Sequence, residues 1–356
     1  MNAGYYNIEN LVKFALIGPR RFSNSYRYSN YKVDFISDNE LDLIIRLNSF
    51  KPDIKDCSIL DDKYYIRKNY FYCKEDDYKI LRWEVEIKNL ESLPIHVNIN
   101  LKPSLLKIMN VSYILLEGII IDPLIHYILT LKKCALIHAS CIAREDEGFM
   151  FIARGGAGKT TIATHLIGKG FNFISDNYTI LTPEKDVIGF IEPLNIFTYN
   201  LNKNIRVNFI RKTELKIKSL IYKLSKEYIK LFTRINPLDI FTNIDKKTKL
   251  RATFLLLPCN EAKNTIQLFR ISKDKLTKHI CYNQILEFPY FDRYITVYSY
   301  VLPNSIMSEH WENYRNLLDN NLCENIYLIK IPQIINKDVT EIILGAINND
   351  KQDTKL

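Results

Sequence analysis

The sequence predicts a protein of mixed α+β or α/β class, in which a mixed sheet is preceded by a β-rich N-terminal region. Three observations support this prediction. Residues 83–87 and 95–101 alternate apolar and polar side chains, which is the period of a half-buried strand. Residues 148–176 read as strand, glycine turn, helix and strand. Further strand-like and helical runs continue to the C-terminus, so we expect a β-rich region over 1–103 and a second domain over 104–356.

The composition is typical of a globular protein with a substantial core, since 47% of the 356 residues are hydrophobic and 25% are charged. The seven cysteines are odd in number and form no C-x-x-C pair, which favours reduced thiols in the cytoplasm over a disulfide scaffold or a zinc site. The first 18 residues lack a charged start, so we expect no signal peptide. Charged residues interrupt the apolar stretch 105–131, which we expect to form buried helices and no membrane span.

In the first region, β-branched and aromatic residues predict strands. These strands are expected over 31–36, 41–45, 64–67, 79–88 and 95–101. Two helices are expected over 104–116 and 122–131, the second with Asp122 as its N-cap and Pro123 at its first position. A strand over 135–143 and a short turn then lead into the glycine-rich segment.

The glycine-rich segment, Ala153 to Thr160, reads A-R-G-G-A-G-K-T, the phosphate-loop pattern with Ala in place of the first Gly. Glycines permit a turn in which backbone N–H groups surround a phosphate, Lys159 would reach the β- and γ-phosphates, and Thr160 would hold Mg²⁺. Apolar residues on both sides predict the strand and helix that this motif requires. We therefore expect a nucleotide site formed by Gly155, Gly156, Ala157, Gly158, Lys159, Thr160 and Thr161.

The run GGAGKTT, a helix ending in L-I-G-K-G and an acid that closes the next strand resemble the HPr kinase/phosphorylase family and its kinase-like relatives. These proteins share a fold with the ATP-dependent phosphoenolpyruvate carboxykinases. Asp176 follows Lys159 by 17 residues, as in that family, and the run His138-Ala-Ser resembles a strand that precedes the family's loop. The resemblance implies an HPr kinase-like domain that uses ATP and Mg²⁺ to phosphorylate a hydroxyl, on Ser or Thr of a protein or peptide rather than on a free metabolite. Because its members are often oligomeric, it also implies a homo-oligomer.

The resemblance assigns catalytic roles to Asp176, Lys159 and His138, and metal binding to Thr160, Asp176 and Asn177. The family has two adjacent acids where this chain has Asp176-Asn177, so a neutral oxygen ligand is kept and one charge is lost. Both residues also have a purely structural alternative: His138 can be a hydrogen-bonded core residue, and Asp176 can be a turn residue at a strand end.

The segment 202–251 is strongly basic. It holds 14 Lys or Arg against 4 Asp or Glu, about +10, while the whole chain carries +9. Apolar residues at near-helical spacing predict an amphipathic helix over 213–233. We expect this basic insertion to receive an acidic partner, a protein or peptide before a nucleic acid, or to be a solvated helix face. The alternative to a kinase is a non-catalytic ATP-binding protein whose basic insertion captures such a partner.

Beyond Asp176, residues 178–182 and 187–191 predict a hairpin. Later strands are expected over 253–258, 265–271, 293–300 and 325–332. Helices are expected over 305–318 and 339–346.

Overall fold

The computed structural model describes residues 1–78, 81–102, 111–196, 209–224, 233–259, 266–332 and 337–353. The chain forms two compact units: unit 1 comprises 1–133 and 285–316, and unit 2 comprises 134–284 and 317–356. The expected mixed α+β class and the β-rich N-terminal region are confirmed. We expected a division at residue 103, but the described residues 111–133 and a later stretch, 285–316, group with the N-terminal region.

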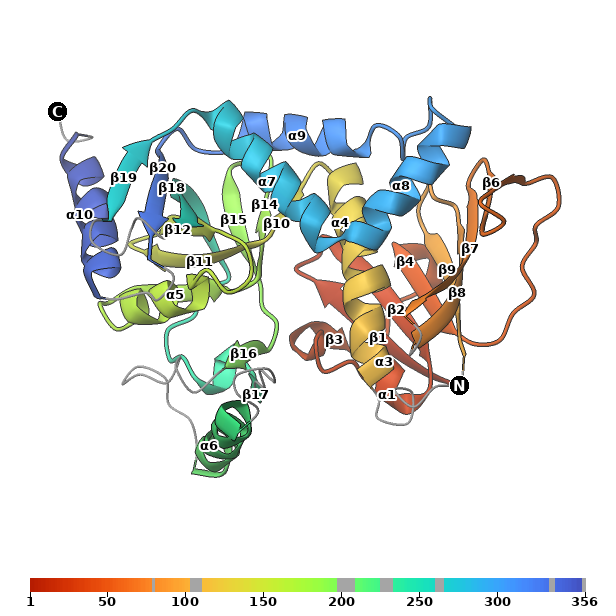
Figure 1. Ribbon diagram of the computed structural model, residues 1–356, viewed down its shortest axis with the longest axis horizontal. Helices are drawn as coiled ribbons and strands as arrows, with labels where there is room; N and C mark the ends of the chain where they lie inside the picture. Colours follow the sequence, from red (N-terminus) through yellow and green to blue (C-terminus); the bar gives the residue numbers. More distant parts are fainter. Residues whose placement is uncertain are drawn as a thin grey trace. The chain divides into compact units, whose positions relative to one another are not determined.

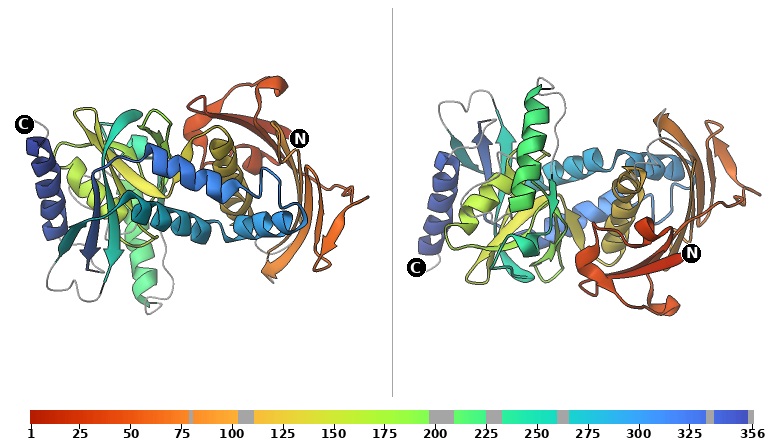
Figure 2. Two further views of the ribbon diagram at one scale, coloured as in Figure 1. Left: turned by 90° about the horizontal axis from the view of Figure 1, so that it is seen from above. Right: turned by 90° about the horizontal axis from the view of Figure 1, so that it is seen from below.

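Unit 1 is built on one large sheet whose described strands follow the order β3-β1-β2-β4-β9-β8-β7-β6-β5. Its strands are β1 Asn2–Ile8, β2 Val12–Gly18, β3 Lys32–Val33, β4 Leu43–Leu47, β5 Ser58–Leu60, β6 Tyr64–Arg67, β7 Tyr70–Tyr78, β8 Leu81–Lys88 and β9 Ile95–Leu101. The pairs β2/β4 and β4/β9 are parallel. Figures 1 and 2 show a curved layer with helices against one face.

The N-terminal hairpin of β1 and β2 was not predicted. Glu9 and Asn10 adopt positive φ angles of 46° and 60° in its turn, which only a few residue types do readily. Tyr6 and Phe14 are fully buried and stack with their ring centroids 4.9 Å apart. The first 18 residues, for which no strand was predicted, therefore include a pair of strands that contribute to the core.

One continuous helical stretch crosses unit 1: α3 Val111–Leu116, a π-helical turn η3 Glu117–Ile121, and α4 Asp122–Leu131. Against our expectation, the helical stretch Ser112–Leu131 is long and apolar enough to cross a membrane, but 72% of its 18-residue apolar window is buried inside the structure, as in a core helix. The N-cap prediction for Asp122 is wrong, because the helix continues through it. Its buried carboxylate instead accepts a hydrogen bond from Tyr28 and pairs with Arg27 at 2.7 Å.

The predicted strand over 293–300 is also wrong. These residues lie in α8, Pro289–Val301. Phe291, Tyr294, Ile295 and Tyr298 recur at helical spacing and are all buried, so packing of one helix face overrides the β propensity of tyrosine, isoleucine and valine.

Unit 2 contains a second mixed sheet, with the path β10-β14-β15-β18-β12-β11-β13 and with β20 joining β18 to β19. The strands are β10 Ala135–Ile137, β11 Ala139–Arg144, β12 Glu147–Ile152, β13 Asn172–Ser175, β14 Tyr178–Leu181, β15 Asp186–Phe190, β18 Lys247–Pro258, β19 Gln267–Arg270 and β20 Ile326–Ile331. The hairpin of β14 and β15 is confirmed. The expected strand over 135–143 is interrupted at His138.

The described helices that remain are α1 Arg20–Ser23, α5 Lys159–Ile167, α6 Phe209–Leu224, α7 Lys273–Glu287, α9 His310–Asn321 and α10 Lys337–Asp353. Helix α6 begins before the predicted 213–233, and 225–232 lie outside the described residues. Within unit 2, a separate two-stranded antiparallel sheet of β16 Leu194–Ile196 and β17 Thr233–Ile235 brackets the α6 segment.

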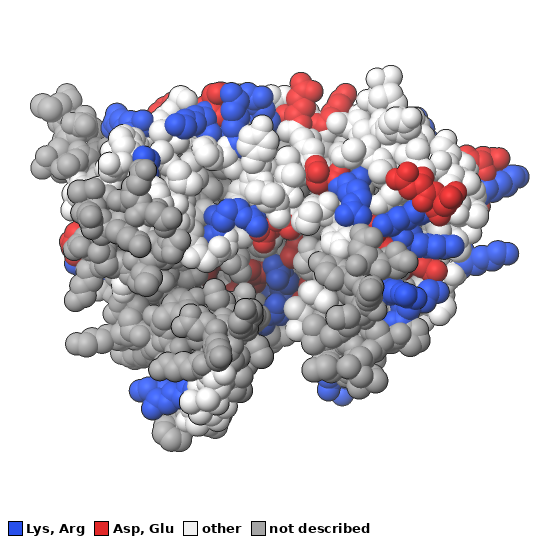
Figure 3. Space-filling model, viewed as in Figure 1, with Lys and Arg blue, Asp and Glu red and all other residues white. Residues whose placement is uncertain are grey.

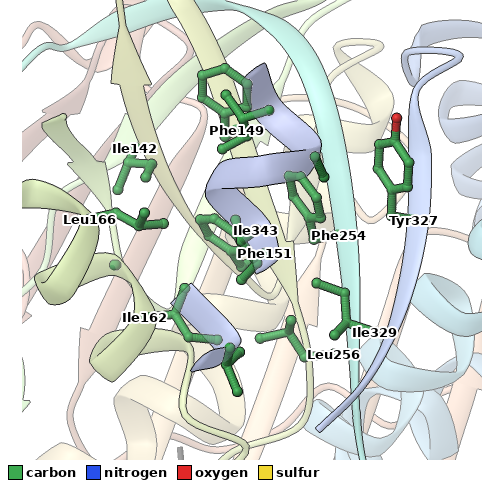
Figure 4. Close-up of a cluster of buried hydrophobic side chains, with 14 of the residues drawn as sticks. Ile142, Phe149, Phe151, Ile162, Leu166, Phe254, Leu256, Tyr327, Ile329 and Ile343 are labelled. Atoms are coloured by element: carbon green, nitrogen blue, oxygen red, sulfur yellow. The ribbon is translucent and has the colours of Figure 1, made fainter. Parts of the chain in front are cut away.

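The core of unit 2 lies between its sheet and the helices α5 and α10 (Figure 4). Phe151 on β12 stacks on Phe254 of β18, and Phe254 stacks on Tyr327 of β20. Ile162 of α5 and Ile343 of α10 belong to the same cluster. Loss of one such buried aromatic side chain costs about 3–5 kcal/mol, so this cluster holds β12 and α5 in fixed relation.

Candidate functional site

The glycine-rich segment forms a tight loop between β12 and α5, as its apolar flanks predict. Gly156 and Gly158 have φ angles of +82° and +88°, a conformation that only glycine adopts without strain. The N–H of Ala157 donates to the carbonyl of Arg154 at 3.2 Å and closes the turn. Helix α5 then begins at Lys159, directly after the turn.

The loop has an open, polar surface. A Cβ atom added to Gly155 or Gly156 would meet no atom within 4 Å. Within the described part of the chain, the N–H groups of Gly155, Gly156 and Gly158 make no hydrogen bond. Unpaired N–H groups beside a helix N-terminus attract an anion, because the helix dipole adds positive charge at that end.

Lys159, the first residue of α5, is almost fully buried and folds back on the loop. Its ammonium donates to the carbonyl of Ala153 at 2.7 Å and to that of Arg154 at 3.4 Å. These two bonds hold the positive charge of Lys159 at the loop.

The Thr160 hydroxyl donates to Asp176 Oδ2 at 2.7 Å, joining the start of α5 to the end of β13. Asp176 is buried, and its Oδ1 has no hydrogen-bond partner among the described residues. Burial raises the pKa of the Asp176 carboxyl, while the Thr160 hydroxyl and the charges of Lys159 and His138 oppose that rise. A buried acceptor oxygen without a donor indicates a place for a ligand atom or a cation.

His138, between β10 and β11, lies near this carboxylate and helps to lower its pKa. Its backbone N–H donates to Gln284 Oε1 at 3.3 Å, and its ring lies 5.5 Å from that of Tyr178. His138 is therefore buried at the edge of the site. This position suits either a hydrogen-bonded core residue or a residue that acts on the ligand.

Asn177 follows Asp176 in the left-handed conformation, with φ of 72°. Its side-chain amide donates to Glu192 Oε1, across the gap between the ends of β13 and β15. Glu192 is 2% exposed. Glu192 was not among the predicted site residues, because the Glu192-Pro193 pair in the sequence does not by itself show where this carboxylate lies.

The structure therefore gathers Lys159, Thr160, Asp176 and Asn177 at one strand edge, with His138 nearby and Glu192 added. Gly155 and Gly156 are exposed on the loop, Ala157 is buried beneath it, and Thr161 lies one residue further into α5. No cluster of three or more His, Cys, Asp or Glu side chains that could hold a metal occurs among the described residues. Mg²⁺ needs no such cluster, because it binds through one or two protein oxygens together with water and phosphate oxygens.

No family model matched the chain in a scan of protein families, and no curated protein matched it in a sequence search.

Proposed function

We propose that the protein is an ATP-dependent kinase of the HPr kinase-like type, which transfers the γ-phosphate of ATP to a hydroxyl of a protein or peptide. The observation that supports this most is the hydrogen bond between Thr160 and Asp176 beside a glycine loop with unpaired N–H groups. A loop for phosphates, a hydroxyl for the cation and a carboxylate next to it are the parts that phosphoryl transfer requires.

In this proposal the glycine N–H groups and Lys159 bind the phosphates of ATP, which would release the lysine from the carbonyl of Ala153. Thr160 and Asp176 would hold Mg²⁺, whose charge offsets that of the phosphate oxygens. The orphaned Oδ1 of Asp176 fits this role, as does the hard-oxygen character of the donor set.

Asp176 also orients or deprotonates the acceptor hydroxyl, a role that its carboxylate beside the loop can serve. Glu192 restores the number of carboxyl groups at the position where Asn177 replaces an acid. The hydrogen bond from the Asn177 amide to the buried Glu192 carboxylate leaves the Asn177 carbonyl oxygen as a neutral oxygen ligand at this edge.

The test is incubation of the purified protein with Mg²⁺ and γ-labelled ATP, with and without lysate from its own cell. We expect label on a polypeptide, at a rate that falls by roughly two orders of magnitude or more when Asp176 is replaced by Asn. ATP binding without transfer to any acceptor would instead favour the non-catalytic ATP-binding protein.

A further inference from the structure

Helix α6 presents an exposed apolar stripe. Ile217, Leu220 and Leu224 are 55%, 57% and 74% exposed. At about 100° per residue they share one side of the helix, roughly opposite Leu215, which is 1% exposed. The helix thus has an inner apolar face that packs and an outer one that solvent reaches.

The inner face anchors α6 to the elements that carry the candidate site. Leu215 packs in a cluster with Phe173, Leu194, Ile196 and Ile235. Phe173 lies on β13, three residues before Asp176, and Leu194 follows Glu192 by two residues. A segment bound to α6 is therefore held on a helix whose inner face packs against β13, the strand that leads to Asp176.

Basic side chains border the stripe on one side. Lys212 and Lys216 are exposed and form no ion pair within the part of the chain that the structure describes. Arg211 and Lys218 instead pair with Glu214, and Lys218 above all lowers the pKa of that carboxyl to about 2. Figure 3 shows blue side chains beside white ones at the described part of α6. An apolar stripe edged with uncompensated positive charge selects a partner that is apolar on one face and acidic beside it.

We propose that the outer face of α6 docks an acidic amphipathic helix of a partner polypeptide. Its apolar side chains cover Ile217, Leu220 and Leu224, and its carboxylates meet Lys212 and Lys216. A second copy of α6 is a poor occupant because it would bring like charges together. An anionic membrane fits less well, since the stripe lacks a tryptophan anchor. That this partner carries the phosphate acceptor rests on the kinase function proposed above.

The probe is a fluorescein-labelled 18-residue helical peptide with Leu at i, i+3 and i+7 spacing and Glu on its other faces. Its affinity is measured by anisotropy for the parent and for a triple variant with Ile217→Gln, Leu220→Gln and Leu224→Gln. We expect the triple variant to bind the peptide at least tenfold more weakly than the parent. The reason is that replacing docked apolar side chains by glutamine removes most of the interface energy. The matched control is Tyr282→Gln on α7, which removes another side chain that is 66% exposed and should leave the affinity unchanged.

Two further measurements decide between occupants. A peptide with Lys in place of Glu should not bind the parent, and salt should weaken binding of the acidic peptide. Equal peptide affinity in parent and triple variant, or no peptide binding by the parent, overturns the proposal. The proposal is also overturned if the parent binds phosphatidylglycerol vesicles but not the peptide, and the triple variant no longer binds the vesicles. ATP affinity is measured on the same samples: its absence in the parent contradicts the kinase function and leaves the docking result standing.

Discussion

At the scale of single residues, the ionised form of the buried Asp176 carboxylate reduces the stability of the fold. Its folded-state pKa is raised above 3.8, so the protonated form favours folding and the ionised form disfavours it. This contribution to stability is fully present below about pH 3.8 and is lost as pH rises through the folded-state pKa. Functional sites commonly carry such a cost.

We therefore expect Asp176→Asn to melt at a higher temperature than the parent near pH 7 in metal-free buffer, with the difference shrinking toward pH 4. Phosphoryl transfer should fall by roughly two orders of magnitude or more, the usual size of a general-base contribution. Thermal melts across this pH range and labelled-ATP assays measure the two effects. A parent that is the more stable protein at pH 7 contradicts the assignment of burial as the dominant influence.

Gly155 and Gly148 differ in the space around them: Gly155 faces open space, whereas Gly148 is packed closely within the fold. A Cβ added to Gly155 meets nothing, whereas one added to Gly148 lies 2.6 Å from Thr248 Cγ2 and 3.1 Å from the carbonyl of Lys249. We expect Gly155→Ala to keep the melting temperature of the parent and to weaken ATP binding, because the methyl group enters the phosphate cradle. Gly148→Ala should lower stability by about 1–3 kcal/mol. Unchanged ATP affinity in a folded Gly155→Ala variant would argue against a phosphate in this loop.

For the pair Asn177 and Glu192, we predict that a carboxylate removed at one position can be replaced by a carboxylate at the other. Glu192→Gln should weaken Mg²⁺-dependent ATP binding and slow transfer, because the edge then holds one carboxylate. Adding Asn177→Asp to that variant should restore much of both, since it returns an acid to the position beside Asp176. Titration of ATP with and without Mg²⁺ separates the metal effect from nucleotide binding. Failure of the double variant to recover would show that Glu192 only holds Asn177 in place.

At the scale of elements, the candidate site depends on how closely β13 and β15 approach. A Cβ on Gly189 of β15 would lie 2.2 Å from the carbonyl oxygen of Ile174 on β13. Asp176 follows β13 and Glu192 follows β15, so only a glycine at 189 lets the two carboxylates share one edge. Gly189→Ala should lower both stability and transfer, whereas Gly345→Ala on α10, where an added Cβ meets nothing, should do neither. Equal melts for the two variants would contradict this account.

Local patterns predicted the elements nearest the site and missed those that depend on distant packing. The glycine turn, α5 and the β14/β15 hairpin have local signals: positive-φ glycines, helical spacing and alternation. Helix α8 was predicted as a strand because tyrosine and β-branched residues favour strands. Burial of one face of these residues against the rest of the fold makes them helical instead. Glu192 escaped notice for a related reason. Its approach to Asn177 is set by strand packing around Gly189, which a single sequence does not display.

At the scale of the whole molecule, each of the two units has its own sheet and buried core, so each can unfold in its own transition. Only unit 2 contains the proposed nucleotide site. A ligand stabilises the state that binds it, by about 2.7 kcal/mol at a hundredfold excess over its dissociation constant. For a unit of roughly 190 residues this corresponds to a rise of roughly 5–10 °C in melting temperature.

We expect calorimetry with Mg²⁺ and ATP to raise one transition by about this amount and to leave the other in place. The transition that Gly189→Ala lowers identifies unit 2. Lys159→Ala should abolish the shift, because it removes the ammonium that lies against the loop carbonyls of Ala153 and Arg154. Its melt without ligand, measured beside that of the parent, checks that the variant is folded. The same shift in parent and Lys159→Ala, or a shift confined to the transition that Gly189→Ala leaves unchanged, would place ATP binding outside the glycine loop.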